Sequence, residues 1–208
     1  DWITSSWKKE SELSRYNRSA NKEEFLLSGD LKWLIERSRE IEQLTAGAFN
    51  IGQDKGNLDL SGIAKGYAVD RIAEYLTEDL GIESFLVDIG GEIKAKGINP
   101  KGEVWNVGIF IPPGHDAIKS PRFRLEDSSI TTSGRYFKGS HITDPETGKA
   151  VSHSLISVSV INTSNTKADA LATALYVMGS KKGLTWARDH QIRAIFILGD
   201  GTILKSQQ

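Results

Sequence analysis

Residues 155–161, with the sequence Leu-Ile-Ser-Val-Ser-Val-Ile, give the clearest indication of the fold. This short run is rich in β-branched residues, which is typical of a buried strand. Residues 167–178 and 181–190, separated by a Gly-Ser pair, are predicted to form two helices. Residues 193–198 return to the strand pattern, so the C-terminal part of the chain is expected to run strand, helix, helix, strand.

Helical patterns also occur in the N-terminal half. Residues 30–45 have apolar side chains at the i, i+3, i+4, i+7 spacing of an amphipathic helix, which Ser28 or Asp30 could cap. A second helix is expected from about Ile63 to Leu80. Further strands are predicted at residues 85–87, 104–111 and 130–132. Because helices and strands are mixed without strict βαβ alternation, the sequence predicts one α+β domain over residues 1–208, with mainly antiparallel sheets and packed helices.

The composition excludes several functions. The 208 residues include 26 basic and 27 acidic ones, with a net charge of -1. The chain therefore lacks the excess of basic residues that is typical of a nucleic-acid-binding surface. Cysteine is absent, which excludes disulfides, thiolate zinc sites and cysteine nucleophiles. No apolar run is long enough to predict a membrane-spanning helix. Because the chain begins at Asp1 rather than at methionine, we expect that a preceding segment, which could carry an export signal, has been removed.

Residues 59–70, Asp-Leu-Ser-Gly-Ile-Ala-Lys-Gly-Tyr-Ala-Val-Asp, form the first of four segments that indicate chemistry. The pattern predicts a strand-like entry, a turn of small residues and a helix. Such a turn directs backbone N–H groups toward a ligand and suits a phosphate, and Lys65 adds positive charge. The spacing differs from that of a Walker loop. A tight turn with an exposed lysine explains the segment equally well.

Two further segments contain turn residues. Residues 87–92, Val-Asp-Ile-Gly-Gly-Glu, are best explained as a hairpin turn with a bulge, although paired glycines also allow close approach of a ligand. Residues 131–134, Thr-Thr-Ser-Gly, are followed by His141 and a turn bracketed by Asp-Pro and Thr-Gly. His141 could act as a general base because its ordinary pKa is near neutrality, or it could be structural. The other histidines, His115, His153 and His190, have no such setting.

The fourth segment spans residues 167–175 and contains Asp169 and Thr173 four positions apart. On a helix these two side chains share one face. A carboxylate and a hydroxyl are hard oxygen ligands that suit Mg²⁺, which binds few protein groups and keeps waters or phosphates. We expect Asp169 to face the surface and to carry little packing. The alternative is a helix with an acid near its start and a buried threonine.

Taken together and in order, the segments resemble the ApbE-like FAD:protein FMN transferases, also called flavin transferases. Residues 11–17, Ser-Glu-Leu-Ser-Arg-Tyr-Asn, resemble one family motif, and residues 45–50, Thr-Ala-Gly-Ala-Phe-Asn, resemble another. The four segments above supply five further matches, over most of the chain. The resemblance implies an α+β, T-fold-like architecture. It also implies that the family's usual N-terminal strand is missing before Asp1, and that a mid-chain insertion is missing between Asn50 and Asp59.

The resemblance implies specific site residues. In the family, Mg²⁺ is held by a backbone carbonyl, an aspartate and a threonine, which correspond to Gly62, Asp169 and Thr173. The positions that contact FAD correspond to Trp7, Ala48, Phe49, Asn50, Asp59, Lys65 and Thr143. His141 matches the histidine proposed as the catalytic base. Gly62 stands where alanine is frequent, which a carbonyl ligand tolerates.

The implied activity is Mg²⁺-dependent cleavage of FAD. The FMN half is attached through a phosphoester to a threonine of an acceptor protein, and AMP is released. The same site would support an FAD pyrophosphatase that releases FMN and AMP, and a flavin-binding protein without catalysis is a third possibility. By resemblance, the acceptor belongs to a membrane redox complex. The expected location is periplasmic or extracytoplasmic, with membrane anchoring through the removed N-terminal segment.

Overall fold

The computed structural model describes residues 2–52, 56–115, 117–134 and 142–207. Within these residues, a six-stranded sheet has the order β1-β2-β5-β6-β7-β8. Every pair of neighbouring strands is antiparallel. Its strands are β1 (Phe85–Ile89), β2 (Glu92–Lys96), β5 (Ser128–Gly134), β6 (Leu155–Asn162), β7 (Arg193–Leu198) and β8 (Ile203–Lys205). A separate pair is formed by β3 (Trp105–Gly108) and β4 (Arg122–Leu125). The predicted α+β class with antiparallel sheets is confirmed.

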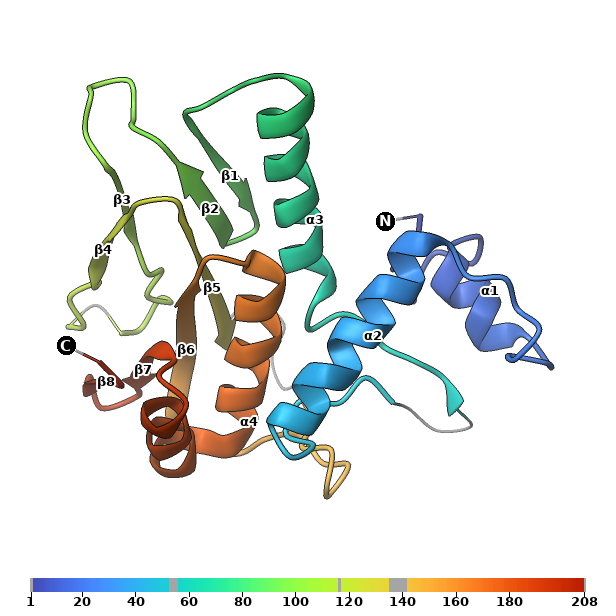
Figure 1. Cartoon of the computed structure of the whole chain (residues 1–208). Coiled ribbons are helices and arrows are strands. Elements are labelled where there is room, and N and C mark those ends of the chain that lie inside the picture. The colour runs from blue at the N-terminus through green and yellow to red at the C-terminus, as the bar shows by residue number, and fades with distance from the viewer. Residues whose placement is uncertain (1, 53–55, 116, 135–141, 208) are drawn as a thin grey trace.

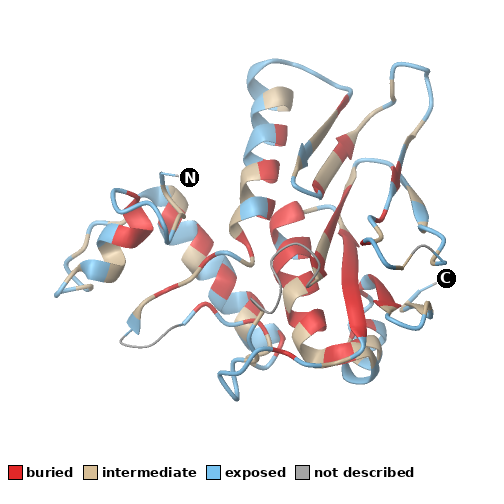
Figure 2. Cartoon of the chain, turned by 180° about the vertical axis from the view of Figure 1, so that it is seen from behind, coloured by how far each residue is buried: buried red, intermediate tan, exposed pale blue. Residues whose placement is uncertain are grey.

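The helices and the β3–β4 pair lie on opposite faces of the large sheet (Figure 1). On the helical face, α4 (Asn165–Asp189) packs along β5, β6 and β7, and α3 (Ala64–Glu74) packs beside it against β1 and β2. The helices α1 (Glu12–Arg18) and α2 (Gly29–Leu44) extend to the side of α3 and α4 (Figure 1). Burial is concentrated on α4 and on the central strands, as Figure 2 shows.

Strand β6 contributes to both hydrophobic layers, and a register shift within it changes which residues face each layer. The irregularity lies between Leu155 and Ser157. Leu155 before it and Val158 and Val160 after it belong to the helical layer, whereas Ile156 and Ile161 belong to the opposite layer. A β-bulge of this kind reverses which face each side chain takes. The apolar run at 155–161 is therefore the centre of the molecule.

Most of the expected elements are present. Ser28 caps α2 through its hydroxyl, which accepts the N–H of Leu31. Asp30 instead accepts the hydroxyl of Tyr67, so its predicted role as an alternative cap is wrong. Gly179 interrupts α4 with a positive φ of 75°, where the sequence predicts a break between two helices. Among the described residues, no helix is long and apolar enough to cross a membrane.

Other boundaries differ from the prediction. The helix expected over 63–80 ends as α3 at Glu74 and continues as a π-helical segment, η2 (Tyr75–Asp79). The strand expected over 104–111 is reduced to the four residues of β3. The elements that the sequence analysis did not predict are α1, β2, β4 and β8.

Asp70, the last residue of the 59–70 motif, joins α3 to the beginning of α4. Its carboxylate accepts the N–H groups of Asn165 (3.0 Å) and Thr166 (2.8 Å), the hydroxyls of Ser164 and Thr166, and the ammonium of Lys94 at 2.6 Å. Burial alone would raise the pKa of Asp70, but these donors outweigh it and hold the pKa below its usual range. Asp70 is therefore a structural residue that fixes where α4 begins.

Asp70→Ala is expected to destabilise the protein by about 3 kcal/mol, because it leaves Lys94 and the first N–H groups of α4 without their acceptor. Urea unfolding at neutral pH measures this loss. The control is Glu74→Ala, which removes the exposed ion pair with Arg71 and should change stability by less than about 0.5 kcal/mol. Equal losses in the two variants would contradict a structural role for Asp70.

Candidate functional site

Three of the predicted site residues meet at the turn before α3. A Cβ built on Gly62 would lie 3.2 Å from Oγ1 of Thr173 and 3.3 Å from Cε2 of Phe49. These residues come from the turn, from α4 and from the segment after α2, so the fold brings together positions that are distant in sequence. Thr173 Oγ1 also lies 3.1 Å from Oγ of Ser133, at the end of β5. Ser133 lies within residues 131–134, but the sequence pattern indicated no role for it.

Asp169 lies one helical turn before Thr173 and is only 4% exposed. Its Oδ2 accepts the N–H of Gly66 at 2.9 Å, which ties α4 to the first turn of α3. The expectation that Asp169 faces the surface and carries little packing is therefore wrong. The reason is the close approach of the two helices at Gly66, which the sequence of α4 alone does not show.

The turn does not present the row of free N–H groups that its sequence predicts. The N–H of Ser61 donates to Oδ1 of Asp59, and those of Ile63 and Ala64 donate to the carbonyl of Leu60. With the Gly66 N–H bonded to Asp169, four of the N–H groups in this segment are already used within the protein. A phosphate here would be held mainly by side chains, a cation and the positive end of the α3 dipole.

Lys65 forms an ion pair with Glu92 of β2, a residue that the sequence analysis did not select. The Lys65 side chain is 48% exposed, whereas that of Glu92 is 2% exposed. Gly90 and Gly91 form a two-residue turn with positive φ angles of 63° and 97°, and Ile89 pairs directly with Glu92. The predicted hairpin is thus confirmed, but the predicted bulge is wrong. The tight turn fixes Glu92 on the helical face of the sheet.

Two buried carboxyl groups share this region. Burial and the charge of Asp169 raise the pKa of Glu92 to about 7, against the opposing effect of Lys65. Burial raises the pKa of Asp169 to about 6, against the opposing effects of Lys65 and the Gly66 N–H. Both groups would be stabilised in their ionised form by a bound cation.

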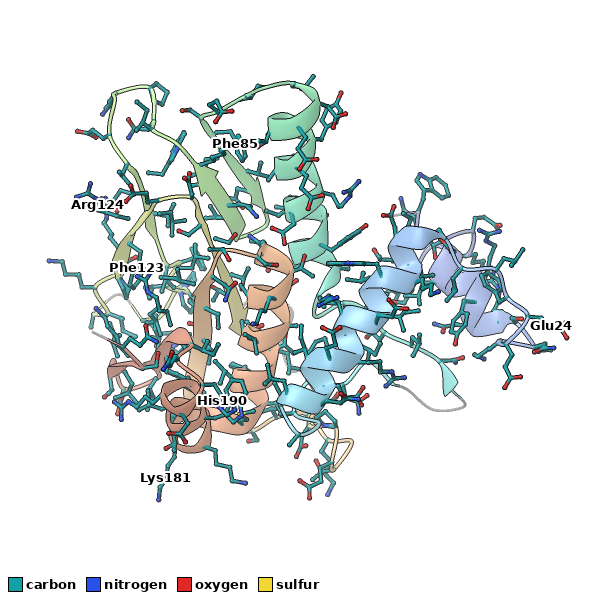
Figure 3. The ribbon with its side chains drawn as sticks, in the orientation of Figure 1. Glu24, Phe85, Phe123, Arg124, Lys181 and His190 are labelled. Atoms are coloured by element: carbon teal, nitrogen blue, oxygen red, sulfur yellow. The ribbon has the colours of Figure 1, made fainter. Side chains whose placement is uncertain are left out.

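Charged residues outside the site have a different environment. Figure 3 labels three of them, Glu24, Arg124 and Lys181, whose side chains point outward from the surface.

The metal-free protein is expected to lose stability as the pH rises from about 5 to about 8. The folded-state pKa values of Glu92 and Asp169 lie above their unfolded values, so the folded protein retains protons that the unfolded chain releases in this range. Asp70 acts in the opposite direction, but only at more acidic pH, because its folded pKa is lowered. Urea unfolding in a chelator at pH 5 and pH 8 should give a lower midpoint at pH 8. A midpoint that rises between these pH values would contradict the prediction, and Glu92→Gln should flatten the dependence.

The remaining predicted positions in the segments next to the turn differ in how far they are exposed. Phe49 is buried and Ala48 is half-buried beside it, while Asn50 is exposed and its Oδ1 accepts the N–H of Gly52 at 2.6 Å. Asp59 is half-buried directly before the turn. Asn17 of the 11–17 motif exchanges two hydrogen bonds with the backbone of Leu58, at 2.8 and 2.9 Å, and so positions this segment.

Two predicted flavin contacts lie on the surface. Trp7 is 92% exposed, and the exposed Thr143 forms a β-bridge with Ala150. In the described part of the chain, no hydrogen bond or ring contact joins either residue to the turn before α3. Their roles remain predictions. His141, the predicted catalytic base, lies outside the described residues.

The donor set fits a small, hard cation. Thr173 supplies a hydroxyl next to Gly62, and Asp169 supplies a carboxylate one helical turn away. The described residues contain no group of three or more His, Cys, Asp or Glu side chains that could hold a metal ion. A carboxylate and a hydroxyl are ligands that Mg²⁺ takes, because it binds one or two carboxylates and completes its shell with water or phosphate.

A surface hollow of about 630 Å³ lies elsewhere, lined by Lys119, Ser120, Pro121, Ile203 and Lys205. It contains none of the predicted site residues. The site at the turn is therefore identified by its chemistry and by the convergence of three chain segments rather than by its concavity.

The fold of the chain, an antiparallel sheet with helices on one face, is similar to that of solved flavin transferases. The structure resembles the flavin transferase ApbE from Vibrio cholerae with a TM-score of 0.85 and 31% identity, covering 97% of this chain and 82% of that one. It resembles the apo form of the Pseudomonas stutzeri flavinyl transferase ApbE with a TM-score of 0.87 and 27% identity, covering 99% of this chain and 81% of that one.

The chain belongs to the ApbE family, whose model matches residues 1–55 and 51–196. It is 31% identical over 249 positions to the FAD:protein FMN transferase of Vibrio cholerae, covering 93% of this chain and 74% of the relative. It is 35% identical over 161 positions to the enzyme of that name from Haemophilus influenzae, covering 72% of this chain. The match spans 46% of the Haemophilus protein, so the aligned part of the chain covers less than half of that relative.

Proposed function

We propose that this chain is a Mg²⁺-dependent FAD:protein FMN transferase. It would cleave FAD at the pyrophosphate, attach FMN through a phosphoester to a threonine of an acceptor protein, and release AMP. The observation that carries the proposal is the convergence of Gly62, Thr173 and Asp169 at the turn before α3, with Phe49 against it. The names of the relatives and of the solved structures support flavin transfer as the reaction class.

The chain's own residues have distinct roles in this proposal. Asp169, Thr173 and the carbonyl of Gly62 would hold the cation, which when bound supplies positive charge to the pyrophosphate and to the AMP leaving group. The hydroxyl of Ser133 can accept a hydrogen bond from the hydroxyl of Thr173. This arrangement would leave the lone pairs of the Thr173 oxygen free for the cation. Lys65 supplies charge at the first turn of α3.

The acceptor step needs a base, because a threonine hydroxyl is a poor nucleophile at neutral pH. His141, which precedes the turn at residues 144–149 in the sequence, is the residue we propose for it. Hydrogen bonds of Asp144 hold this turn together. Asp144 accepts the hydroxyl of Thr147 at 3.0 Å and the N–H of Glu146 at 2.9 Å, and the N–H of Gly148 bonds to its carbonyl. A general base typically contributes about 10²- to 10⁴-fold to such a reaction.

The test is incubation with FAD and Mg²⁺, with and without a threonine-containing acceptor peptide, followed by mass spectrometry. FMN covalently bound to the peptide, together with AMP, supports the proposal. Free FMN and AMP at the same rate with and without peptide would instead identify a pyrophosphatase. Tight FAD binding without turnover would identify a flavin-binding protein. A serine or alanine in place of the acceptor threonine provides the control for site specificity. The extracytoplasmic location and the membrane redox partner stay proposals that this assay leaves aside.

A further inference from the structure

Glu92 has an environment that its ion pair with Lys65 does not fully explain. The residue is 1% exposed, so its carboxyl group has left water almost completely. One oxygen, Oε1, is paired with Lys65. The other, Oε2, is buried and has no hydrogen-bond partner among the described residues. An unpaired buried carboxylate oxygen is costly, so its presence calls for a group that is bound during function.

Glu92 lies beside the proposed cation site, because its partner Lys65 directly precedes Gly66, whose N–H donates to Asp169 at 2.9 Å. The charge of Asp169 acts on Glu92, and Lys65 acts on both carboxyl groups, so the three side chains occupy one electrostatic environment. The backbone beside Glu92 is tied to α4 as well, because Asn165 donates its amide to the carbonyl of Ile93 at 2.9 Å. Asn165 lies one helical turn before Asp169. When both carboxyl groups are ionised, two carboxylates and one lysine leave a net negative charge in a buried position.

The neighbouring ion pair does not neutralise this charge. Lys94, two residues along the same face of β2, is bonded to Asp70 at 2.6 Å and to the carbonyl of Thr163 at 3.0 Å. Its ammonium is therefore already matched by an acid of its own. The remaining negative charge on Glu92 and Asp169 is available to a cation.

We infer that Glu92 is a second acidic residue of the cation site, whose buried carboxylate supplies negative charge to the metal ion beside Asp169, directly or through a metal-bound water. Lys65 neutralises part of this charge when no cation is bound. The inference rests on the proposed function to the extent that Asp169 must hold the cation. It adds a residue from the sheet to a site otherwise built from α4 and the turn before α3.

The test is titration of the protein with Mn²⁺ alone, with free Mn²⁺ measured by electron paramagnetic resonance. Glu92→Gln keeps the shape of the side chain and removes its charge, and we expect it to weaken Mn²⁺ binding at least tenfold. Glu83→Gln is the matched control, because Glu83 is also paired with a lysine, Lys96, at 3.2 Å, but is exposed. It should bind Mn²⁺ as the wild type does. Glu92→Asp, which retains the charge, should recover part of the affinity.

Measuring the same substitution in a Lys65→Met protein separates a direct effect of Glu92 on the cation from an effect through Lys65. Lys65→Met alone should strengthen Mn²⁺ binding, because it removes a nearby positive charge. If Glu92 acts on the cation, Glu92→Gln weakens binding in the Lys65→Met protein as well. If Glu92 only positions Lys65, the substitution has no effect in that background, and the inference is overturned.

Asp169→Asn distinguishes failure of the inference from failure of the proposed function. Loss of Mn²⁺ binding in Asp169→Asn with wild-type affinity in Glu92→Gln would overturn the inference alone. Wild-type affinity in Asp169→Asn would show that the cation is not held at this site, and would overturn both proposals. Circular dichroism and the thermal unfolding midpoint in chelator verify that each variant is folded, and we expect Glu92→Gln to be at least as stable as the wild type.

Discussion

Asp169→Asn should reduce cation-dependent cleavage of FAD by about a hundredfold or more. The substitution removes the charged ligand while keeping an oxygen that can accept the Gly66 N–H. A metal ion that polarises a phosphoryl group supplies several kcal/mol of transition-state stabilisation, and each 1.36 kcal/mol corresponds to a factor of ten in rate. The measurement is the rate of AMP release at saturating FAD across a range of Mg²⁺ concentrations.

The stability of the same variant separates a lost ligand from a damaged fold. Because burial disfavours the ionised form of Asp169, the neutral asparagine should leave the thermal midpoint in chelator unchanged or higher at pH 8. Added Mg²⁺ should raise the midpoint of the wild type but not that of the variant, since only a ligand bound to the folded state stabilises it. Undiminished AMP release by Asp169→Asn would remove this residue from the site.

Gly66→Ala should lower stability by about 3 kcal/mol, through overpacking between two helices. A Cβ at this position would lie 2.5 Å from the carbonyl oxygen of Asn165 and 2.8 Å from Cβ of Asp169. Neither atom can move unless α3 and α4 separate, and their separation would also break the hydrogen bond from Gly66 to Asp169. For a chain of this length the thermal midpoint should fall by on the order of 10 °C. Alanine normally stabilises a helix relative to glycine by about 1 kcal/mol, so a loss would show that contact overrides propensity.

Gly62→Ala is the matched comparison, four residues earlier. There the nearest atoms to an added Cβ are side-chain atoms, Oγ1 of Thr173 at 3.2 Å and Cε2 of Phe49 at 3.3 Å. Shifts of a few tenths of an ångström relieve these contacts, so the expected cost is below about 1 kcal/mol. Differential scanning calorimetry of the two variants tests the contrast. A Gly66→Ala protein as stable as Gly62→Ala would mean that α3 can move away from α4 at little cost.

The predictable parts of the fold are those in which burial imposes a regular pattern. Helix α2 has one apolar face and a serine cap, and β6 is an apolar run, so both are evident from sequence. Strand β2 was missed because Glu92 and Lys94, on its helix-covered face, are charged and form ion pairs with Lys65 and Asp70. Only Ile93 and Ala95, which face the opposite layer, follow the apolar pattern. The short strands β4 and β8 were missed because they offer too few residues to establish a period.

In the site, too, features set by local spacing were predictable from the sequence, whereas features set by contacts between distant elements were not. The spacing of Asp169 and Thr173 along one helix is a local property, so the sequence predicted their shared face. The position of Gly62 beside Thr173 depends on how α3 docks against α4, and it was predicted only through the family resemblance. The burial of Asp169 and the role of Glu92 depend on contacts across helices and sheet. Local spacing carries no information about such contacts.

The hydrogen bond between Gly66 and Asp169 joins residues 103 positions apart. At a synthesis rate of 5–20 residues per second, the ribosome needs about 5–20 s to make the chain between them. During that interval the turn before α3 exists without its carboxylate partner, so a metal ion has no complete site that could guide folding. In the proposed function, metal binding would therefore follow completion of the helical layer. In a refolding experiment, Mg²⁺ should slow unfolding while leaving the folding rate nearly unchanged.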